Sequence, residues 1–279
     1  MPAVVTYARA ALPLVPGASL LPFVAGRGKE MPPLERTLAG VRIDPAALAD
    51  YDRVCGFTLR DELPATYLHL KAFPLHMAMM VDGRFPFPAV GLVHLRNRIT
   101  VHRPARVTDV FDLHVRAGPI EPHPKGRTFA FVSTATVDGQ LVWSEESTML
   151  RRGKGSGDAR QSVHQDDAEV AGDPVTWKLP GDLGRRYAAV SGDGNPIHMH
   201  ALTARAFGFP RAIAHGMWTK ARVLAALEAR LPETYTVAVD FRKPILLPGR
   251  VTFAAEQERF AVRSAKDPDI THLEGTVTP

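Results

Sequence analysis

The sequence of 279 residues contains one cysteine, Cys55, so no disulfide can form within the chain. This count excludes a disulfide scaffold and fits a protein of the reducing cytoplasm. Cys55 stands in the apolar stretch YDRVCGF, which favours a small core residue over a nucleophile. The sequence also has no Gly-rich phosphate loop, so it does not predict nucleotide chemistry.

A long uninterrupted apolar run is missing as well. Residues 1–26 are rather apolar, but no positive segment precedes them, and Arg9, Pro13 and Pro16 interrupt them. They match neither a signal peptide nor a membrane span. We therefore predict that residues 1–40 form an N-terminal arm and that the protein is cytoplasmic, without a membrane span.

Clusters of basic residues are also missing, although the formal net charge is +5 and the pI is near 9.5. A basic surface suits an anionic partner such as nucleic acid, a phosphate-bearing cofactor or an acidic carrier protein. Here no run of five or more basic residues occurs, and aromatic residues do not alternate with the basic ones. No binding of nucleic acid is predicted.

The chain divides into two similar parts. Residues 151–175 are rich in Gly, Ser, Asp and Gln and have no apolar period, which predicts a linker between residues 41–150 and 176–279. Three short matches recur in the same order in both parts, which indicates an internal duplication. They are YDRVCG (51–56) with YAAVSG (187–192), AFPLHMAMM (72–80) with GFPRAIAHGM (208–217), and HRPARV (102–107) with LLPGRV (246–251).

Each part is predicted to contain one main helix followed by antiparallel strands. Residues 213–231 have apolar residues at helical spacing and end before Pro232. Asp138 and Gly139 predict a hairpin turn, and Pro244 predicts an edge or bulge. A sheet wrapped round one Ala-rich helix would bury that helix on most sides. Strands are expected at 90–101, 110–118, 127–139 and 140–150, and at 234–247, 250–264 and 271–279.

The stretch SGDGNPIH (191–198) places an ionisable pair in a tight turn. Asn195 is a good helix N-cap, with Pro196 at the first helical position. The glycines permit a bend that folds the Asp193 carboxylate back towards the His198 imidazole. At a helix N-terminus His198 stays neutral, so the pair could hold one water molecule and move its protons. Alternatively, Asp193 and Asn195 only form caps and turns, and His198 is a hydrogen-bonded bystander.

A second motif, GFPRAIAHGM (208–217), leads into the long helix. Gly216 stands at the N-terminus of that helix, where backbone amides lack helical partners and a ligand can approach closely. Its amide could polarise a substrate carbonyl and stabilise negative charge on the oxygen. An ordinary helix start is the alternative interpretation.

Together these residues resemble the MaoC-like family. Tyr187 to His198, with Ala204 after five more residues, is similar to the hydratase-2 signature of (R)-specific enoyl-thioester hydratases, also called 3-hydroxyacyl-thioester dehydratases. Residues 207–217 are similar to the family's second block. The length and layout of the chain resemble actinobacterial long-chain members with two hot-dog domains. The resemblance implies an α+β double hot-dog fold, with antiparallel sheets wrapped round long central helices.

The resemblance also implies an activity, which is reversible hydration of trans-2-enoyl thioesters to (R)-3-hydroxyacyl thioesters. It assigns the catalytic pair to Asp193 and His198, the supporting amide to Asn195, and the oxyanion donor to the Gly216 backbone. His200 departs from a position that is often acidic in the family. The first part has no Asp-x-Asn-Pro-x-His after YDRVCG, so residues 41–150 are predicted to be a degenerate domain and 176–279 the catalytic one.

No cofactor is expected beyond the carrier of the acyl group, which is coenzyme A or acyl carrier protein. Arg242 and Lys243 are candidate phosphate contacts, or simply exposed charges at a strand edge, and Ile213 and His215 are further candidates for substrate binding. No metal is predicted, because His198, His200 and His215 lack an established ligand spacing. A homodimer is possible. The alternative functions are a thioesterase of the same fold and a non-catalytic acyl-binding subunit.

Overall fold

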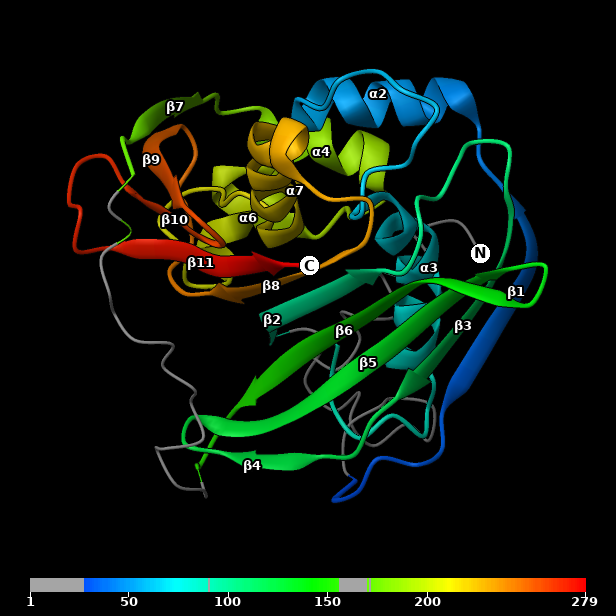
Figure 1. The fold of residues 1–279 in the computed structure, drawn as a ribbon. Coiled ribbons are helices and arrows are strands. Elements are labelled where there is room, and N and C mark those ends of the chain that lie inside the picture. The colour runs from blue at the N-terminus through cyan, green and yellow to red at the C-terminus, as the bar shows by residue number, and fades with distance from the viewer. Residues whose placement is uncertain (1–27, 90, 156–169, 171) are drawn as a thin grey trace.

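The computed structural model describes residues 28–89, 91–155, 170 and 172–279. Its strands form one 11-stranded sheet (Figure 1). The elements are β1 (Glu35–Arg42), α2 (Pro45–Cys55), α3 (Tyr67–Met80), β2 (Leu92–Val101), β3 (Val110–Ala117), β4 (Glu121–His123), β5 (Gly126–Val137), β6 (Gln140–Arg152), β7 (Val175–Leu179), α4 (Leu183–Ser191), α5 (Pro196–Met199), α6 (Ala201–Ala206), α7 (Gly216–Leu227), a 3₁₀ turn (Glu228–Arg230), β8 (Tyr235–Phe241), β9 (Gly249–Glu256), β10 (Arg259–Ser264) and β11 (Thr271–Thr278).

The sheet consists of two halves that meet at one pair of strands. The order is β1-β3-β5-β6-β2 in the N-terminal half and β8-β11-β10-β9-β7 in the C-terminal half, with β4 paired to β5. Strands β2 and β8 pair antiparallel, with Asn97 opposite Val239, and so join the halves into one sheet. This architecture matches the prediction of one helix and its antiparallel strands in each half.

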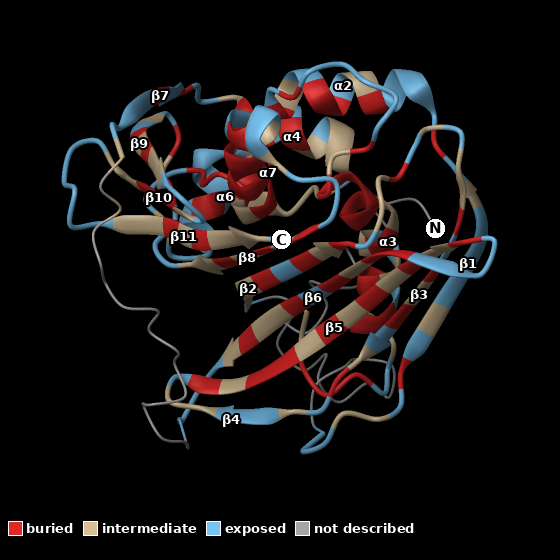
Figure 2. Ribbon diagram, viewed as in Figure 1, coloured by how far each residue is buried: buried red, intermediate tan, exposed pale blue. Residues whose placement is uncertain are grey.

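One long helix lies against each half of the sheet. Figure 2 shows that α3 and α7 are mostly buried, whereas α2 presents an exposed outer side. In α7, Ala221, Val223 and Leu224 are completely covered. The strands bury alternate residues, as in β5, because successive side chains point to opposite faces of a sheet. The apolar face of each half therefore encloses its helix.

One of the three internal matches occupies equivalent places in the two halves, and the other two do not. Helices α2 and α4 both end at a left-handed glycine, Gly56 and Gly192. The bridge between Glu62 and Arg106 corresponds to the bridge between Ile213 and Leu246, which places Arg106 opposite Leu246 and not Arg250, so the match of 102–107 with 246–251 is shifted by four residues. The remaining match, 72–80 with 208–217, is wrong, because residues 72–80 lie inside α3 whereas 208–215 precede α7. The bridges instead align Ile213 with Glu62, so Pro64 stands in the place of His215.

All the predicted strand regions contain strands, but three further strands were missed. These are β1, β4 and β7, whose exposed residues weaken the alternation on which a prediction depends. The predicted hairpin at Asp138 and Gly139 is confirmed, since both residues have positive φ. Helix α7 is shorter than predicted because Ile213 is extended and bridges Leu246.

The predicted arm and linker only partly fall within the described residues. Residues 1–27, 156–169 and 171 lie outside them. Strand β1 starts at Glu35 and pairs with β3, so the end of the predicted arm belongs to the sheet. Strands β6 and β7 likewise enter the predicted linker from its two ends. Among the described residues, no helix is long and apolar enough to cross a membrane.

A buried polar network ties the two central helices to the junction of the halves. Lys220 of α7 donates from Nζ to Asn97 Oδ1 (2.5 Å), to the Asn97 carbonyl (3.2 Å) and to the Val237 carbonyl (3.1 Å). The Asn97 amide donates to Glu145 Oε1 at 2.6 Å, and His69 of α3 donates to the same oxygen at 2.7 Å. Burial lowers the pKa of Lys220, and the charge of Glu145 opposes this effect. The network therefore crosses between the halves beneath β2 and β8.

Candidate active site

The turn after α4 places Asp193 at the start of the candidate site. Gly192 ends α4 in the left-handed conformation, and the chain then bends. Asp193 Oδ1 accepts a hydrogen bond from the Asn195 amide at 3.1 Å, and Asn195 Oδ1 accepts from the Ile197 amide at 3.3 Å. Asn195 is thus the N-cap of α5, with Pro196 behind it, as predicted. Both side chains form turns, and the Asp193 carboxylate remains part of the site.

His198 is buried and fixed by the segment that leads into α7. Its Nδ1 donates to the Ile213 carbonyl at 2.8 Å, while the Ile213 amide donates to the Ile197 carbonyl at 3.1 Å. Because a carbonyl can only accept, the proton of the neutral ring is on Nδ1 and the lone pair is on Nε2. Burial lowers the pKa of His198, and the charge of Asp193 partly opposes this shift. The ring is therefore neutral at pH 7 and has one basic nitrogen.

His215, the N-cap residue of α7, completes the group. Its ring stacks on that of His198 with centroids 3.7 Å apart, and its Nε2 donates to the Asp193 carbonyl at 3.0 Å. The same nitrogen lies 3.7 Å from Asp193 Oδ2. Burial is the main reason why the pKa of His215 falls to about 3. His215 is therefore neutral and joins the two predicted catalytic residues.

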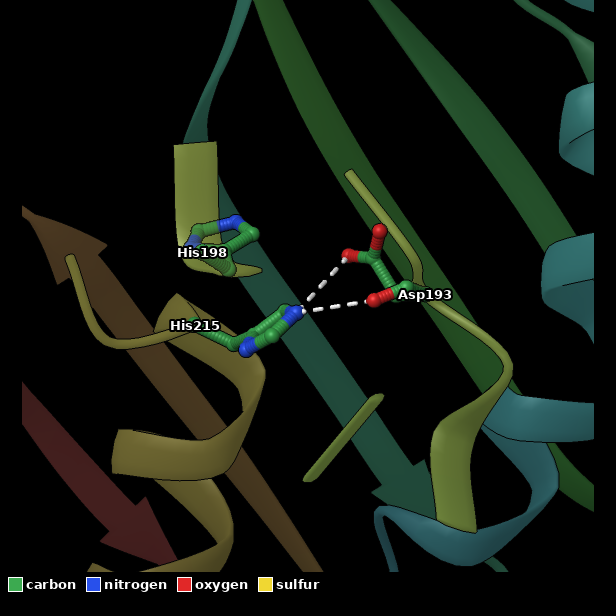
Figure 3. A group of neighbouring side chains, drawn as sticks. All are labelled: Asp193, His198 and His215. Atoms are coloured by element: carbon green, nitrogen blue, oxygen red, sulfur yellow. Dashed lines mark hydrogen bonds and ion pairs between the residues drawn. The ribbon is translucent and has the colours of Figure 1, made fainter. Parts of the chain in front are cut away.

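The three side chains come from separate segments and face one another, as Figure 3 shows. Asp193 follows α4, His198 lies in α5 and His215 precedes α7. One nitrogen or oxygen atom from each lies within 4.8 Å of the corresponding atoms of the other two. A single water molecule can contact a carboxylate and an imidazole at such a spacing. The arrangement can therefore hold water between an acid–base pair.

Gly216 is the first residue of α7, directly after His215. A Cβ atom at this position would lie 2.9 Å from the Phe241 ring, so the packing there requires glycine. The first amides of a helix have no partner within it and carry the positive end of its dipole. The Gly216 amide therefore stands beside His215 as a candidate donor to a substrate oxygen.

The other predicted binding residues have different surroundings. Arg242 forms an ion pair with Glu274, with Nε 2.7 Å from Oε1, so its charge is already balanced. Lys243 is exposed, and its carbonyl accepts from His272 Nδ1 at 3.0 Å. Ile213 is buried and contributes its backbone to the fixing of His198. The structure does not bring Arg242 or Lys243 into the group around His198.

The same group has the composition of a possible metal site. Asp193, His198 and His215 each offer one ligand atom, and these atoms are close together. However, Nδ1 of His198 and Nε2 of His215 already donate to backbone carbonyls. His200, which together with His198 could be mistaken for a ligand pair, is exposed. The absence of a metal stays a prediction.

His215 is the residue whose position sequence analysis did not foresee. The sequence placed it among possible substrate contacts, and its stacking on His198 depends on how the segment 212–215 packs beside α5. The bond from His198 Nδ1 to the Ile213 carbonyl makes that packing specific. The one signal in the sequence was that His215 directly precedes Gly216, the predicted oxyanion donor.

Comparisons with known sequences and structures agree on one family. The model of the family "MaoC like domain" matches residues 159–276. The chain is 37% identical to 3-hydroxyacyl-thioester dehydratase X of Mycobacterium tuberculosis over 243 residues, covering 86% of this chain and 83% of that protein. The crystal structure of HtdX from the same organism superposes with a TM-score of 0.76 at 34% identity, covering 88% of this chain and 99% of HtdX.

A more distant structure supports the architecture alone. It is another Mycobacterium tuberculosis protein, described as a double hot-dog fold, with a TM-score of 0.51 and 15% identity. The match covers 87% of this chain and 94% of that one. The predicted double hot-dog architecture is confirmed by these matches together with the two halves of the sheet.

Proposed function

Since the chain belongs to the MaoC-like family, we propose that it is a hydro-lyase acting on acyl thioesters. It adds water reversibly across the double bond of trans-2-enoyl thioesters and forms (R)-3-hydroxyacyl thioesters. Hydroxyl goes to C3 and a proton to C2, and dehydration reverses both steps. The observation that carries the proposal is the meeting of Asp193 and His198 within 4.8 Å, beside the residue that precedes Gly216.

His198 acts as the principal base towards water. Its Nδ1–H bond to the Ile213 carbonyl leaves Nε2 able to accept a proton, and burial keeps the ring neutral until water gives that proton up. Asp193 holds the same water and shares the proton with His198, so the two titrate as a pair. A positioned acid–base pair of this kind accelerates a reaction by about 10²–10⁴-fold.

Three further groups support this chemistry. The Gly216 amide stabilises negative charge on the thioester oxygen, where one lost donor typically costs about 10²–10³-fold in rate. Asn195 shapes the turn by donating its amide to Asp193 and capping α5. His215 orients Asp193 through its bond to the Asp193 carbonyl.

The acyl group arrives on coenzyme A or on acyl carrier protein, and no other cofactor takes part. Both carriers are anionic, which suits the net charge of +5. Of the two predicted phosphate contacts, Lys243 is the stronger candidate, because Glu274 already balances the charge of Arg242. A cytoplasmic location and a homodimer stay predictions. Size-exclusion chromatography with light scattering would test the homodimer.

Substitutions of the pair test the function. Asp193→Asn and His198→Gln should each lower hydration of crotonyl-coenzyme A by about 10²-fold or more, with unchanged circular dichroism. Asp269→Asn and His200→Gln make the same changes at exposed positions and should retain the wild-type rate. Near-normal rates in the first two variants would refute the assignment.

The alternative functions give different products. A thioesterase would release a free thiol from the same substrate. A non-catalytic acyl-binding subunit would bind the thioester without any change in enoyl absorbance. Following thiol release and enoyl absorbance in one experiment therefore separates all three.

A further inference from the structure

A cavity of about 360 Å³ lies where α2 of the N-terminal half meets β7, α4 and α7 of the C-terminal half. Its lining is unusual in charge. Four cationic residues contribute to it, namely Arg53, Lys178, Arg186 and Arg222, whereas none of the described residues that line it is acidic. Like charges that converge on one hollow repel each other and attract an anion.

Arg222 supplies the innermost positive charge of the cavity. It is half-buried in α7, and its guanidinium lies 5.1 Å from the centre of the Trp177 ring. A Cβ atom on Gly56 would be within 2.0 Å of Arg222 Nη1, so the guanidinium packs directly on the backbone at the end of α2. This packing restrains the side chain before any ligand arrives, which lowers the entropic cost of binding.

The cations of the cavity have few anionic partners. Arg53 pairs with Asp50 at 2.8 Å. Within the part of the chain that the structure describes, no ion pair involves Lys178, Arg186 or Arg222.

The C-terminal end of α2 also points here and carries about half a negative charge. The Trp218 indole N–H already donates to the Val54 carbonyl at this end, at 3.0 Å. The helix end therefore balances only part of the positive charge.

We propose that this cavity binds a phosphate-bearing ligand, with Arg222 at its inner wall and Lys178 and Arg186 at its rim. Guanidinium groups suit phosphate because they offer paired N–H donors in a plane. The volume admits a phosphate ester or a diphosphate. The site is separate from Asp193 and His198, since its lining includes none of the residues of that group.

Binding is measured on the full chain without turnover, so this test does not depend on the proposed activity. Inorganic pyrophosphate is the probe. Two of the three tryptophans, Trp177 and Trp218, line the cavity, so binding should give a saturable change in tryptophan fluorescence. Isothermal titration calorimetry gives the affinity independently. The affinity should fall as ionic strength rises.

Two variants and a matched control locate the site. Arg222→Gln should weaken pyrophosphate binding at least tenfold. The double variant Lys178→Gln/Arg186→Gln should do the same, and it decides the matter if Arg222→Gln fails to fold, because both side chains are exposed. Arg230→Gln removes one exposed charge outside the cavity and should leave binding unchanged. The absence of saturable binding, or an equal loss in Arg230→Gln, would overturn the proposal.

The phosphate has two possible sources, which a competition experiment distinguishes. If the phosphate belongs to the carrier of the substrate, pyrophosphate competes with crotonyl-coenzyme A. In that case Arg222→Gln raises the KM for crotonyl-coenzyme A. If it belongs to a separate small molecule, pyrophosphate binds together with the substrate and KM stays the same. Adenosine 3′,5′-bisphosphate, which reproduces the nucleotide end of coenzyme A, should compete only in the first case.

Discussion

Replacing His215 by phenylalanine tests whether this residue positions Asp193. The change keeps a flat ring against His198 but removes the Nε2–H donor to the Asp193 carbonyl, a bond of 3.0 Å. Leaving such an acceptor unpaired costs about 1–3 kcal/mol. If the bond holds Asp193 in its reactive position, kcat/KM should fall by about 5- to 150-fold.

The fold should tolerate this substitution. Nδ1 of His215 is buried and has no hydrogen-bond partner among the described residues, so the histidine already carries an unfavourable group. Phenylalanine removes that cost while it leaves the Asp193 carbonyl unpaired, and the two effects oppose each other. The free energy of unfolding, measured in urea, should change by less than about 2 kcal/mol.

Conservative rescue separates positioning from packing. The amide nitrogen of glutamine can take the place of His215 Nε2, whereas that of asparagine takes the place of Nδ1. His215→Gln should therefore restore more activity than His215→Asn. His200→Phe makes the same change at an exposed histidine and should keep wild-type kcat/KM. Wild-type kcat/KM in a folded His215→Phe protein would refute the reasoning.

Three other outcomes follow from the site. Burial lowers the pKa of His198, so its basic form persists below pH 6.5. The value of kcat/KM should therefore stay flat from pH 8 to about 6.5 and fall only in more acid solution. A midpoint of this fall above pH 7 would contradict the assignment. Gly216→Ala should destabilise the protein by about 1–3 kcal/mol, since its Cβ would meet Phe241; Phe241→Leu in the same chain should recover part of the loss, and unchanged urea unfolding of the single variant would contradict the packing. EDTA should leave the hydration activity intact. Added Zn²⁺ should inhibit hydration by binding between Asp193, His198 and His215. An activity that is lost in EDTA and restored by a metal ion would show instead that the enzyme needs a metal.

The local part of the candidate site could be predicted because its signals are local. Asn195 and Pro196 have the chemistry of a helix start, and the structure places them at one. Asp193 and His198 lie close together in sequence, so one turn brings them together in space. The contact of His198 with His215 depends on the separate segment 212–215, and no spacing in the sequence encodes such a contact.

The fold was predicted where periodicity is strong and missed where exposure weakens it. Strand β5 alternates clearly and was found, whereas β1 has mostly exposed residues and lies at one edge of the sheet. Glu145 shows a further limit. It lies within a predicted strand, yet only the packing of α3 and β2 against β6 turns its carboxylate into a buried partner of His69 and Asn97.

The lysine beneath the junction makes the two repeats depend on each other. A fragment of residues 176–279 would keep the turn with Asp193 and His198, but it would lose Asn97, which supplies two of the three acceptors of Lys220. The loss of these acceptors and of the strand that carries them removes part of the about 5–15 kcal/mol that keeps a typical domain folded. Strand β8 would also become a bare edge open to aggregation. We therefore predict that residues 176–279 alone are inactive and that the smallest active unit contains both repeats.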